Sequence, residues 1–222
     1  MAGSYNIKDF IQWALFGFLV AMVATFLLSR RDRTPKTPTN QPIIKTVTTN
    51  AAPTLPVISQ VQPFSLTNQL GKVVTQTDLD DAPWLANIIF TRCPTVCPKI
   101  TQTVSTILPE LPESLKVVSL TTDPAHDTPE VLGKFAELNQ AQTNRWHFLT
   151  GDKASLMQLA VTDLKMISKP KTPEHQESPN DLFVHSSLLI LVDGAGQVRA
   201  AFESDAPDLL NQIQAALSKL KP

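Results

Sequence analysis

Hydrophobic and polar positions alternate between strand-like and helix-like patterns over most of the chain after about residue 61. Two nearly continuous apolar runs, residues 84–90 and 116–122, are typical of strands covered on both faces of a sheet. A shorter run at residues 146–151 predicts a third strand, and a segment with helical character follows each of the three. Strands that alternate with helices predict an α/β domain.

Turn and cap signals divide the rest of this domain. Residues 64–79 predict a strand, a turn at 68–71 and a second strand, and residues 185–204 predict a hairpin that turns at 193–196. A polar loop interrupted by prolines is expected at residues 168–181, just before the second hairpin. Four helices are predicted. Two are expected at about 98–108 and 206–220, and a third follows the cap residue Asp152. The fourth begins with a cap at Asp127 or Thr128 and has Pro129 in its first turn.

An uncharged stretch, residues 10–28, precedes the domain and contains Gln12 as its one clearly polar residue. A helix of this length is about 28 Å long, close to the hydrocarbon thickness of a bilayer. Apolar residues occur all around it, which argues against a buried core helix. A cleaved signal peptide is the stronger alternative, but no small-residue pair follows the stretch before Ser29 and Arg30. We therefore predict a retained single-span anchor at 10–28, after a short tail at 1–9.

Residues 29–60 are rich in Pro, Thr, Asn and Gln and contain neither glycine nor an aromatic residue. Such a segment cannot bury enough apolar surface to offset the conformational entropy lost on ordering. It predicts a semi-extended tether between the anchor and a soluble domain at 61–222, which is long enough for one well-buried core.

Charge adds two constraints. The 222 residues include 19 basic and 20 acidic side chains, so there is no electrostatic case for a nucleic-acid partner. The basic cluster at residues 30–36 would place the soluble domain in the cytoplasm by the positive-inside rule. A family resemblance given below implies the opposite orientation.

Both cysteines lie in the stretch FTRCPTVCPKI, and a proline follows each of them. A residue before proline is disfavoured in the α conformation, so the pair is not expected inside one regular helix. We expect a loop from Cys93 to Val96 and a helix that begins at Cys97 with Pro98 in its first turn. A thiol there is close to the positive end of the helix dipole and to free N–H groups, which favour the thiolate.

Two thiols at this spacing suit a structural disulfide, a redox pair or a metal site. A bridge that closes so short a loop removes little chain entropy, which disfavours a purely structural role. The cysteines follow a buried strand, and the segment DPAHD, residues 123–127, follows another. Because ligands of open α/β sheets gather beyond the carboxyl ends of the strands, the pattern predicts a reactive site at this edge.

Four segments in order, FTRCPTVCP, SLTTDPAHDTPEVL, WHFLTG and VHSSLLILVDGAGQV, resemble the Sco/SenC family of membrane-anchored copper proteins. The resemblance covers essentially all of the predicted soluble domain. It implies a thioredoxin-like fold with an N-terminal β-hairpin, preceded by one transmembrane helix and a Pro-rich tether. It also implies a metallochaperone that helps assemble the dinuclear copper centre of cytochrome c oxidase. The family places its soluble domain in the periplasm, anchored to the cell inner membrane, and we follow it over the charge bias.

The copper ligands of that family map onto Cys93, Cys97 and His185. Soft thiolates select Cu(I), and an imidazole added to two sulfurs gives a site that also holds Cu(II). We expect His185 to follow a loop that ends near Asp181 and to enter a parallel strand at the same sheet edge. The implied partners are the copper-accepting subunit of cytochrome c oxidase, a copper donor or thiol reductase, and the membrane.

The remaining histidines, His126, His147 and His175, are expected as a loop residue, a strand residue and a solvated loop residue. Asp123 and Asp127 are expected to shape their turn, and Asp123 could also set the charge around the metal. One departure from the family pattern is Thr95, because many members carry an acidic residue there, in CPDxCP. An uncharged side chain removes a negative charge that favours a bound cation.

A thiol–disulfide oxidoreductase is the alternative function, and whether the chain is an enzyme stays open. Cys93, more exposed by its position, would attack a target disulfide and Cys97 would resolve the mixed disulfide, so both would be catalytic. A peroxidase of the related fold needs a threonine three residues before its reactive cysteine, where this chain has Phe90 and Pro94. A thioredoxin-like reductase has a CxxC motif and a proline just before the strand near Ser186, and this chain has neither.

Overall fold

The computed structural model describes residues 54–142 and 144–220. The predicted tail and membrane helix, and the tether as far as residue 53, lie outside the described residues. Within the described ranges, no helix combines the length and the apolar character needed to cross a membrane. Two residues expected in the tether, Ser59 and Gln60, form a short strand of the folded domain.

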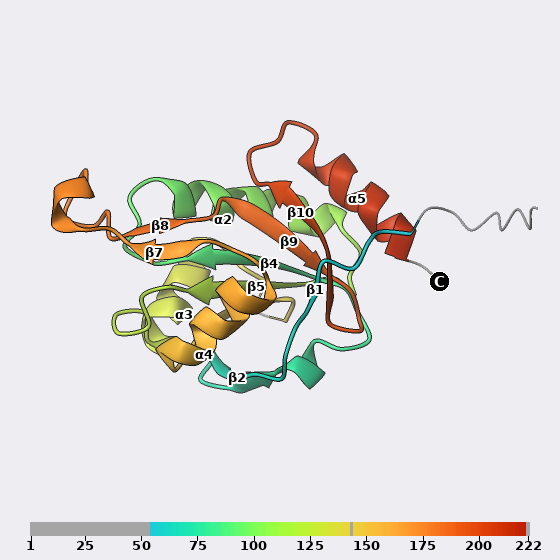
Figure 1. Ribbon diagram of the computed structural model, residues 1–222, viewed down its shortest axis with the longest axis horizontal. Coiled ribbons are helices and arrows are strands. Elements are labelled where there is room, and N and C mark those ends of the chain that lie inside the picture. The colour runs from blue at the N-terminus through green and yellow to red at the C-terminus, as the bar shows by residue number, and fades with distance from the viewer. Residues whose placement is uncertain (1–53, 143, 221–222) are drawn as a thin grey trace, which may run out of the picture. The chain divides into compact units, whose positions relative to one another are not determined.

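An eight-stranded mixed sheet lies at the centre of this domain (Figure 1). Its strands are β1 (Ser59–Gln60), β2 (Ser65–Asn68), β3 (Val73–Thr75), β4 (Trp84–Ile89), β5 (Lys116–Thr121), β6 (Trp146–Thr150), β9 (Leu188–Val192) and β10 (Gln197–Glu203). They lie side by side in the order β1-β10-β9-β4-β5-β6-β2-β3. β4, β5 and β6 are parallel, whereas β9 is antiparallel to β4 and β2 is antiparallel to β6. The hairpins β2–β3 and β9–β10 confirm the two predicted turns.

Helices cover both faces of the sheet. They are α2 (Val96–Ile107), α3 (Pro129–Leu138), α4 (Lys153–Met157) with a π-helical continuation (Gln158–Asp163), and α5 (Leu209–Leu220). Figure 1 shows α2 and α5 on one side of the sheet and α4 on the other. The starts of α3 and α4 confirm their cap signals, because Thr128 accepts from the N–H of Val131 and Asp152 accepts from the N–H of Ser155.

All six residues of β4 are buried, which explains its unbroken apolar sequence. Leu85 and Ile89 point to the core cluster that includes α2, α3 and α5. Trp84 and Ile88 point to the cluster on the opposite face, which includes α4. Each such side chain contributes about 1.5–3 kcal/mol when it is fully buried. The strand that leads into the cysteine segment is therefore held from both sides.

A separate two-stranded ribbon lies next to the cysteine segment and was not predicted. It consists of β7 (Ser168–Pro170) and β8 (Phe183–His185), joined through a 3₁₀ turn at Pro173–His175. The expectation that residues 168–181 form only a loop is therefore wrong. The expectation of a parallel strand at His185 is also wrong, because β8 is antiparallel to β7 and β9 is antiparallel to β4. The chain enters β9 just after His185, at the edge of the sheet where β4 ends, so β9 runs away from that edge and lies antiparallel to β4.

Candidate metal centre

The segment between β4 and α2 carries both cysteines in different backbone environments. The N–H of Cys93 donates to the carbonyl of Phe90 at 3.1 Å, which closes a turn just after β4. Cys97 lies in the first turn of α2, and Pro98 follows it there. Proline fits this position because the first N–H groups of a helix have no partner within the helix. The predicted division holds, with Cys93 in the loop and Cys97 in the helix.

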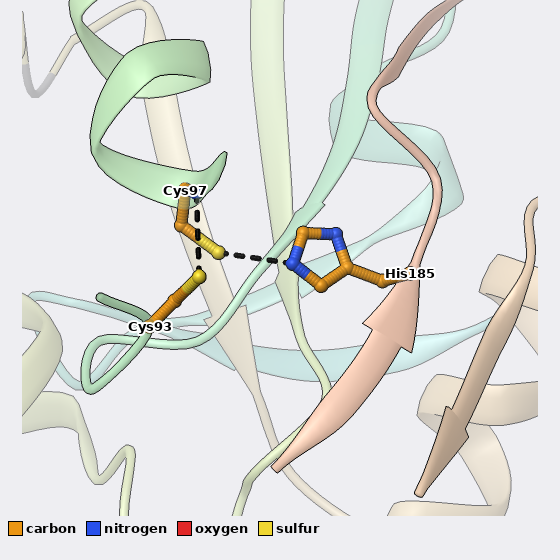
Figure 2. A group of neighbouring side chains, drawn as sticks. All are labelled: Cys93, Cys97 and His185. Atoms are coloured by element: carbon orange, nitrogen blue, oxygen red, sulfur yellow. Dashed lines mark hydrogen bonds between the residues drawn. The ribbon is translucent and has the colours of Figure 1, made fainter. Parts of the chain in front are cut away.

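The two sulfur atoms and the ring of His185 lie together (Figure 2). Both cysteines are free thiols, and Sγ of Cys97 is 3.2 Å from Nε2 of His185. The N–H of Cys97 donates to Sγ of Cys93 at 3.4 Å, and the N–H of Phe90 donates to Sγ of Cys97 at 3.4 Å. Cys97 is completely buried, whereas Cys93 keeps 8% of its surface exposed. Solvent and partners therefore reach the pair at Cys93.

His185 reaches the sulfurs from the ribbon, at the last residue of β8. Nδ1 of its ring is 3.1 Å from the carbonyl oxygen of Ser186, and an oxygen of this kind can only accept. Nδ1 therefore carries a proton, and Nε2 is the ring nitrogen that faces Cys97. Phe90 packs edge-on against the ring, with centroids 5.7 Å apart. The imidazole is thus oriented with Nε2, the nitrogen available to bind a metal, toward the sulfurs.

The thiols differ in their affinity for protons. A hydrogen bond from the Cys97 thiol lowers the pKa of Cys93 well below its ordinary value, and His185 acts in the same direction. Burial raises the pKa of Cys97 far above its ordinary value, and the neighbouring Cys93 raises it further. The expectation of a thiolate at Cys97 is therefore wrong for the metal-free pair, because burial outweighs the helix start. Cys93 is therefore the more acidic thiol of the pair, and Cys97 is its hydrogen-bond donor.

A buried carboxylate connects the cysteine segment to the end of β5. Asp127 accepts from the N–H of Thr91 at 3.2 Å, from the hydroxyl of Thr91 at 2.5 Å, and from the hydroxyl of Thr121. It does not cap α3, because Thr128 does so. Sequence reasoning gave Asp127 a role within its own turn and missed Thr91, since no periodic signal links two residues on different loops.

A salt bridge reinforces this connection at the surface. Asp123 pairs with Arg92 at 2.5 Å, next to Cys93. The Arg92 guanidinium neutralises the Asp123 carboxylate, which was considered above as a source of negative charge near the metal. Asp123 therefore orients the loop through Arg92 and is absent from the cluster of candidate ligands.

A cleft of about 470 Å³ opens beside Cys93. Its two walls are the cysteine segment and the β7–β8 ribbon, and its lining residues are Cys93, Pro94, Thr95, Val96, Lys171, Glu177, Ser178, Asp181, Phe183, Val184 and His185. The ion pair between Lys171 and Asp181, at 2.6 Å, lies in the lining. Thr95 is exposed here, and its side chain makes no capping bond to α2.

The other three histidines lie outside this cluster. His126 is exposed in the loop after β5. His147 lies on β6, where its Nδ1 is 3.5 Å from the side-chain amide of Asn68. His175 lies in the 3₁₀ turn of the ribbon connection, hydrogen-bonded to Thr172. In residues 54–142 and 144–220, the group able to hold a metal ion consists of Cys93, Cys97 and His185.

The three ligand atoms all lie within 4.8 Å of one another. Sulfur and imidazole ligands bind first-row metals at about 2.0–2.3 Å, so two ligands of one ion stand at most about 4.6 Å apart. Small side-chain adjustments are therefore enough for all three atoms to bind one ion. Two soft sulfurs and one imidazole form a donor set suited to copper or zinc and unsuited to magnesium or calcium.

Comparisons with known proteins agree with this geometry. Residues 54–220 match the SCO1/SenC family. The SCO1 protein homolog of Bacillus subtilis is 33% identical over 147 residues, which cover 64% of this chain and 73% of that protein. The solved structure of BsSco, described as a Sco-family cytochrome c oxidase assembly protein with a disulfide switch, is 27% identical. It aligns with a TM-score of 0.64 over 76% of this chain and 98% of that one. Bradyrhizobium japonicum ScoI with copper bound is 23% identical, with a TM-score of 0.58 over 73% of this chain and 100% of that one.

The fold and the site define a thioredoxin-like α/β protein in which a dithiol and an imidazole meet beyond the end of the central strand. Within this class, the chain belongs to the SCO1/SenC family, whose match spans the whole described domain. The family resemblance expected from the cysteine segment is therefore confirmed.

Proposed function

We propose that this protein binds one copper ion through Cys93, Cys97 and His185. The observation that carries the proposal is the meeting of these three ligand atoms within 4.8 Å. A copper-bound structure within the family supports it, since B. japonicum ScoI is described with copper. Two thiolates are sufficient ligands for Cu(I), and the imidazole adds a third donor that suits Cu(II).

The proposed task is delivery of this copper to the dinuclear centre of cytochrome c oxidase. BsSco is described as a cytochrome c oxidase assembly protein, and the present chain shares its fold. Copper is here the cargo, so the site must release it. Release requires a competing ligand set on the acceptor together with reprotonation of the thiolates, because metal binding is coupled to ligand deprotonation. The high pKa of Cys97 favours its reprotonation as copper leaves.

A second candidate function is thiol–disulfide exchange, and one observation favours it. Cys93 is the more exposed thiol and has the lowered pKa, while Cys97 lies buried behind it. This is the arrangement of an attacking and a resolving cysteine. The same chain would then reduce the cysteines of its acceptor before loading them with copper.

We further propose that residues 10–28 anchor the protein in the inner membrane and that the domain lies in the periplasm. The uncharged stretch supports the anchor, and family membership supports the orientation. A reporter enzyme fused after Pro222 should be active only outside the cytoplasm. Reporter activity confined to the cytoplasm would show that the domain has the opposite orientation.

Copper stoichiometry tests the ligand assignment. The reduced full-length chain, in detergent, should bind about one Cu(I), and the Cys93→Ser, Cys97→Ser double variant should bind none. His185→Ala should weaken Cu(II) binding far more than Cu(I) binding, because two sulfurs suffice for Cu(I). The exposed residue His175 provides the matched control, and His175→Ala should leave both affinities unchanged. Stoichiometric binding by the double variant would refute the assignment.

A further inference from the structure

Among residues 54–142 and 144–220, the ribbon strand that carries His185 has one edge without a partner strand. In the β7–β8 pair, the N–H of Ser186 donates to the carbonyl of Ile167, and the N–H of Lys171 donates to the carbonyl of Leu182. Hydrogen-bonded pairs alternate with non-bonded pairs in an antiparallel ladder. The pair Val184–Lys169 lies two positions from each of these hydrogen-bonded pairs. It is therefore also a hydrogen-bonded pair of the ladder.

The backbone groups of Phe183 and His185 consequently point away from β7. Within the part of the chain that the structure describes, β8 pairs with no strand other than β7, and the N–H and C=O groups of Phe183 and His185 form no hydrogen bond with a loop or helix residue. β7 has a proline at the register position opposite Phe183, where no N–H is required for the ladder. β8 therefore presents two donors and two acceptors along its outer edge.

This outer edge borders the cleft that contains Cys93. Phe183, Val184 and His185 line one wall, and Pro94 and Val96 from the cysteine segment line the other. Val184 and Val96 are 50% and 37% exposed. Figure 2 shows β8 beside the cysteine segment, with the ring of His185 extending from the strand toward the sulfurs.

An extended peptide is the ligand that such an edge recognises. Donors and acceptors that recur every second residue match the backbone of a β-strand, and side chains of the added strand alternate between the two faces. A peptide paired with β8 would direct alternate side chains toward Cys93. Exposed valines on both walls would contact its apolar residues.

We propose that the outer edge of β8 binds an extended, sulfur-containing segment of the acceptor protein as an added strand. This inference rests on the proposed function, and it specifies how the acceptor's cysteine is brought to Cys93. The edge supplies affinity through the backbone and sets the register. The residues flanking the acceptor's cysteine are then free to vary, provided that they favour an extended conformation.

A trapped mixed disulfide tests the proposal without any metal. The full-length Cys97→Ser variant in detergent is mixed with the glutathione disulfide of acetyl-Thr-Val-Thr-Cys-Thr-Val-Thr-amide. The Cys93 thiolate attacks the peptide sulfur, the Cys93–peptide bond forms, and the peptide–glutathione bond breaks. Glutathione leaves as a thiolate that takes a proton from water, so there is no net oxidation. Mass spectrometry gives the equilibrium constant.

Two N-methylated peptides test whether the peptide pairs through one of its edges, and each is the control for the other. One is methylated on the third and fifth residues, and the other on the fourth and sixth, so each removes N–H groups from one edge of the peptide. Strand pairing predicts that one of these lowers the equilibrium constant about tenfold, while the other changes it less than twofold. The amide protons of Phe183 and His185 should also become protected from exchange in the mixed disulfide.

Equal losses for both methylated peptides, no loss for either, or failure to form the mixed disulfide would overturn the proposal. Amide protection at Phe183 that rises with protein concentration alone would instead assign the edge to a second copy of the chain. Copper stoichiometry is measured separately. A normal copper site with a negative peptide result rejects the docking edge alone, whereas loss of copper binding by the intact chain rejects the proposed function.

Discussion

At the scale of single residues, the two cysteines differ because only one sulfur is near solvent. Cys97 is enclosed by the core between β4 and α2, where a charged thiolate is costly. Cys93 accepts hydrogen bonds at the loop and keeps contact with the cleft. The sequence indicated the loop and helix positions through the two prolines. It could not indicate the depth of each sulfur, which depends on packing between distant segments.

Alkylation rates test this difference. In the reduced, metal-free chain, limiting iodoacetamide should modify Cys93 at least about tenfold faster than Cys97, because the thiolate is the nucleophile. The thiolate exists above the folded-state pKa, and the pKa of Cys93 is lowered. Its rate should therefore stay nearly constant from pH 8 to pH 6, whereas an ordinary thiol slows about tenfold per pH unit below its pKa of about 8.5. Peptide mapping by mass spectrometry gives both rates. Faster labelling of Cys97 would reverse the assigned roles.

At the scale of elements, the site depends on the ends of β4 and β5 being held together. The N–H of Thr122 donates to the carbonyl of Ile89 at 3.0 Å, and Asp127 adds side-chain bonds to Thr91 and Thr121. The parallel pairing of these strands was predictable because a helical segment separates them, as in a crossover connection. The buried carboxylate that completes the junction was not, because its partner lies 36 residues away.

Asp127→Asn should lower the free energy of unfolding by about 1–3 kcal/mol. The amide has the size of the carboxylate, but its NH₂ group would face hydroxyl and N–H donors and leave some of them without an acceptor. Asp123→Asn is the matched control at the neighbouring salt bridge. It should cost less than about 1 kcal/mol, since the Arg92 side chain is 38% exposed. Urea unfolding monitored by fluorescence of the buried tryptophans gives both values, and equal losses would contradict a special role for Asp127.

The β7–β8 ribbon shows where element prediction failed. Each strand has only three residues, and β7 contains Lys169 and Pro170, so neither carries a usable period-two pattern. The ribbon packs against the cysteine segment through Phe183 and His185, whose rings lie edge-on to Phe90. The role of His185 was predicted through family resemblance, and the strand that positions it became visible only in three dimensions.

At the scale of the whole molecule, folding brings together residues that are far apart in the sequence. Cys97 and His185 are separated by 88 positions, and the mixed sheet and the ribbon between them place their ligand atoms 3.2 Å apart. The order of strands and helices was predictable from hydrophobic periodicity. The antiparallel direction of β9 was not, because an apolar run has the same sequence character in either direction.

X-ray absorption at the copper edge tests the central claim most directly. The full-length chain with one equivalent of Cu(II) should show two sulfur ligands and at least one imidazole nitrogen at the metal. His185→Ala should retain the sulfur signal and lose an imidazole. Copper surrounded only by oxygen and nitrogen, or an imidazole signal unchanged in the variant, would contradict the claim that these three residues share one ion.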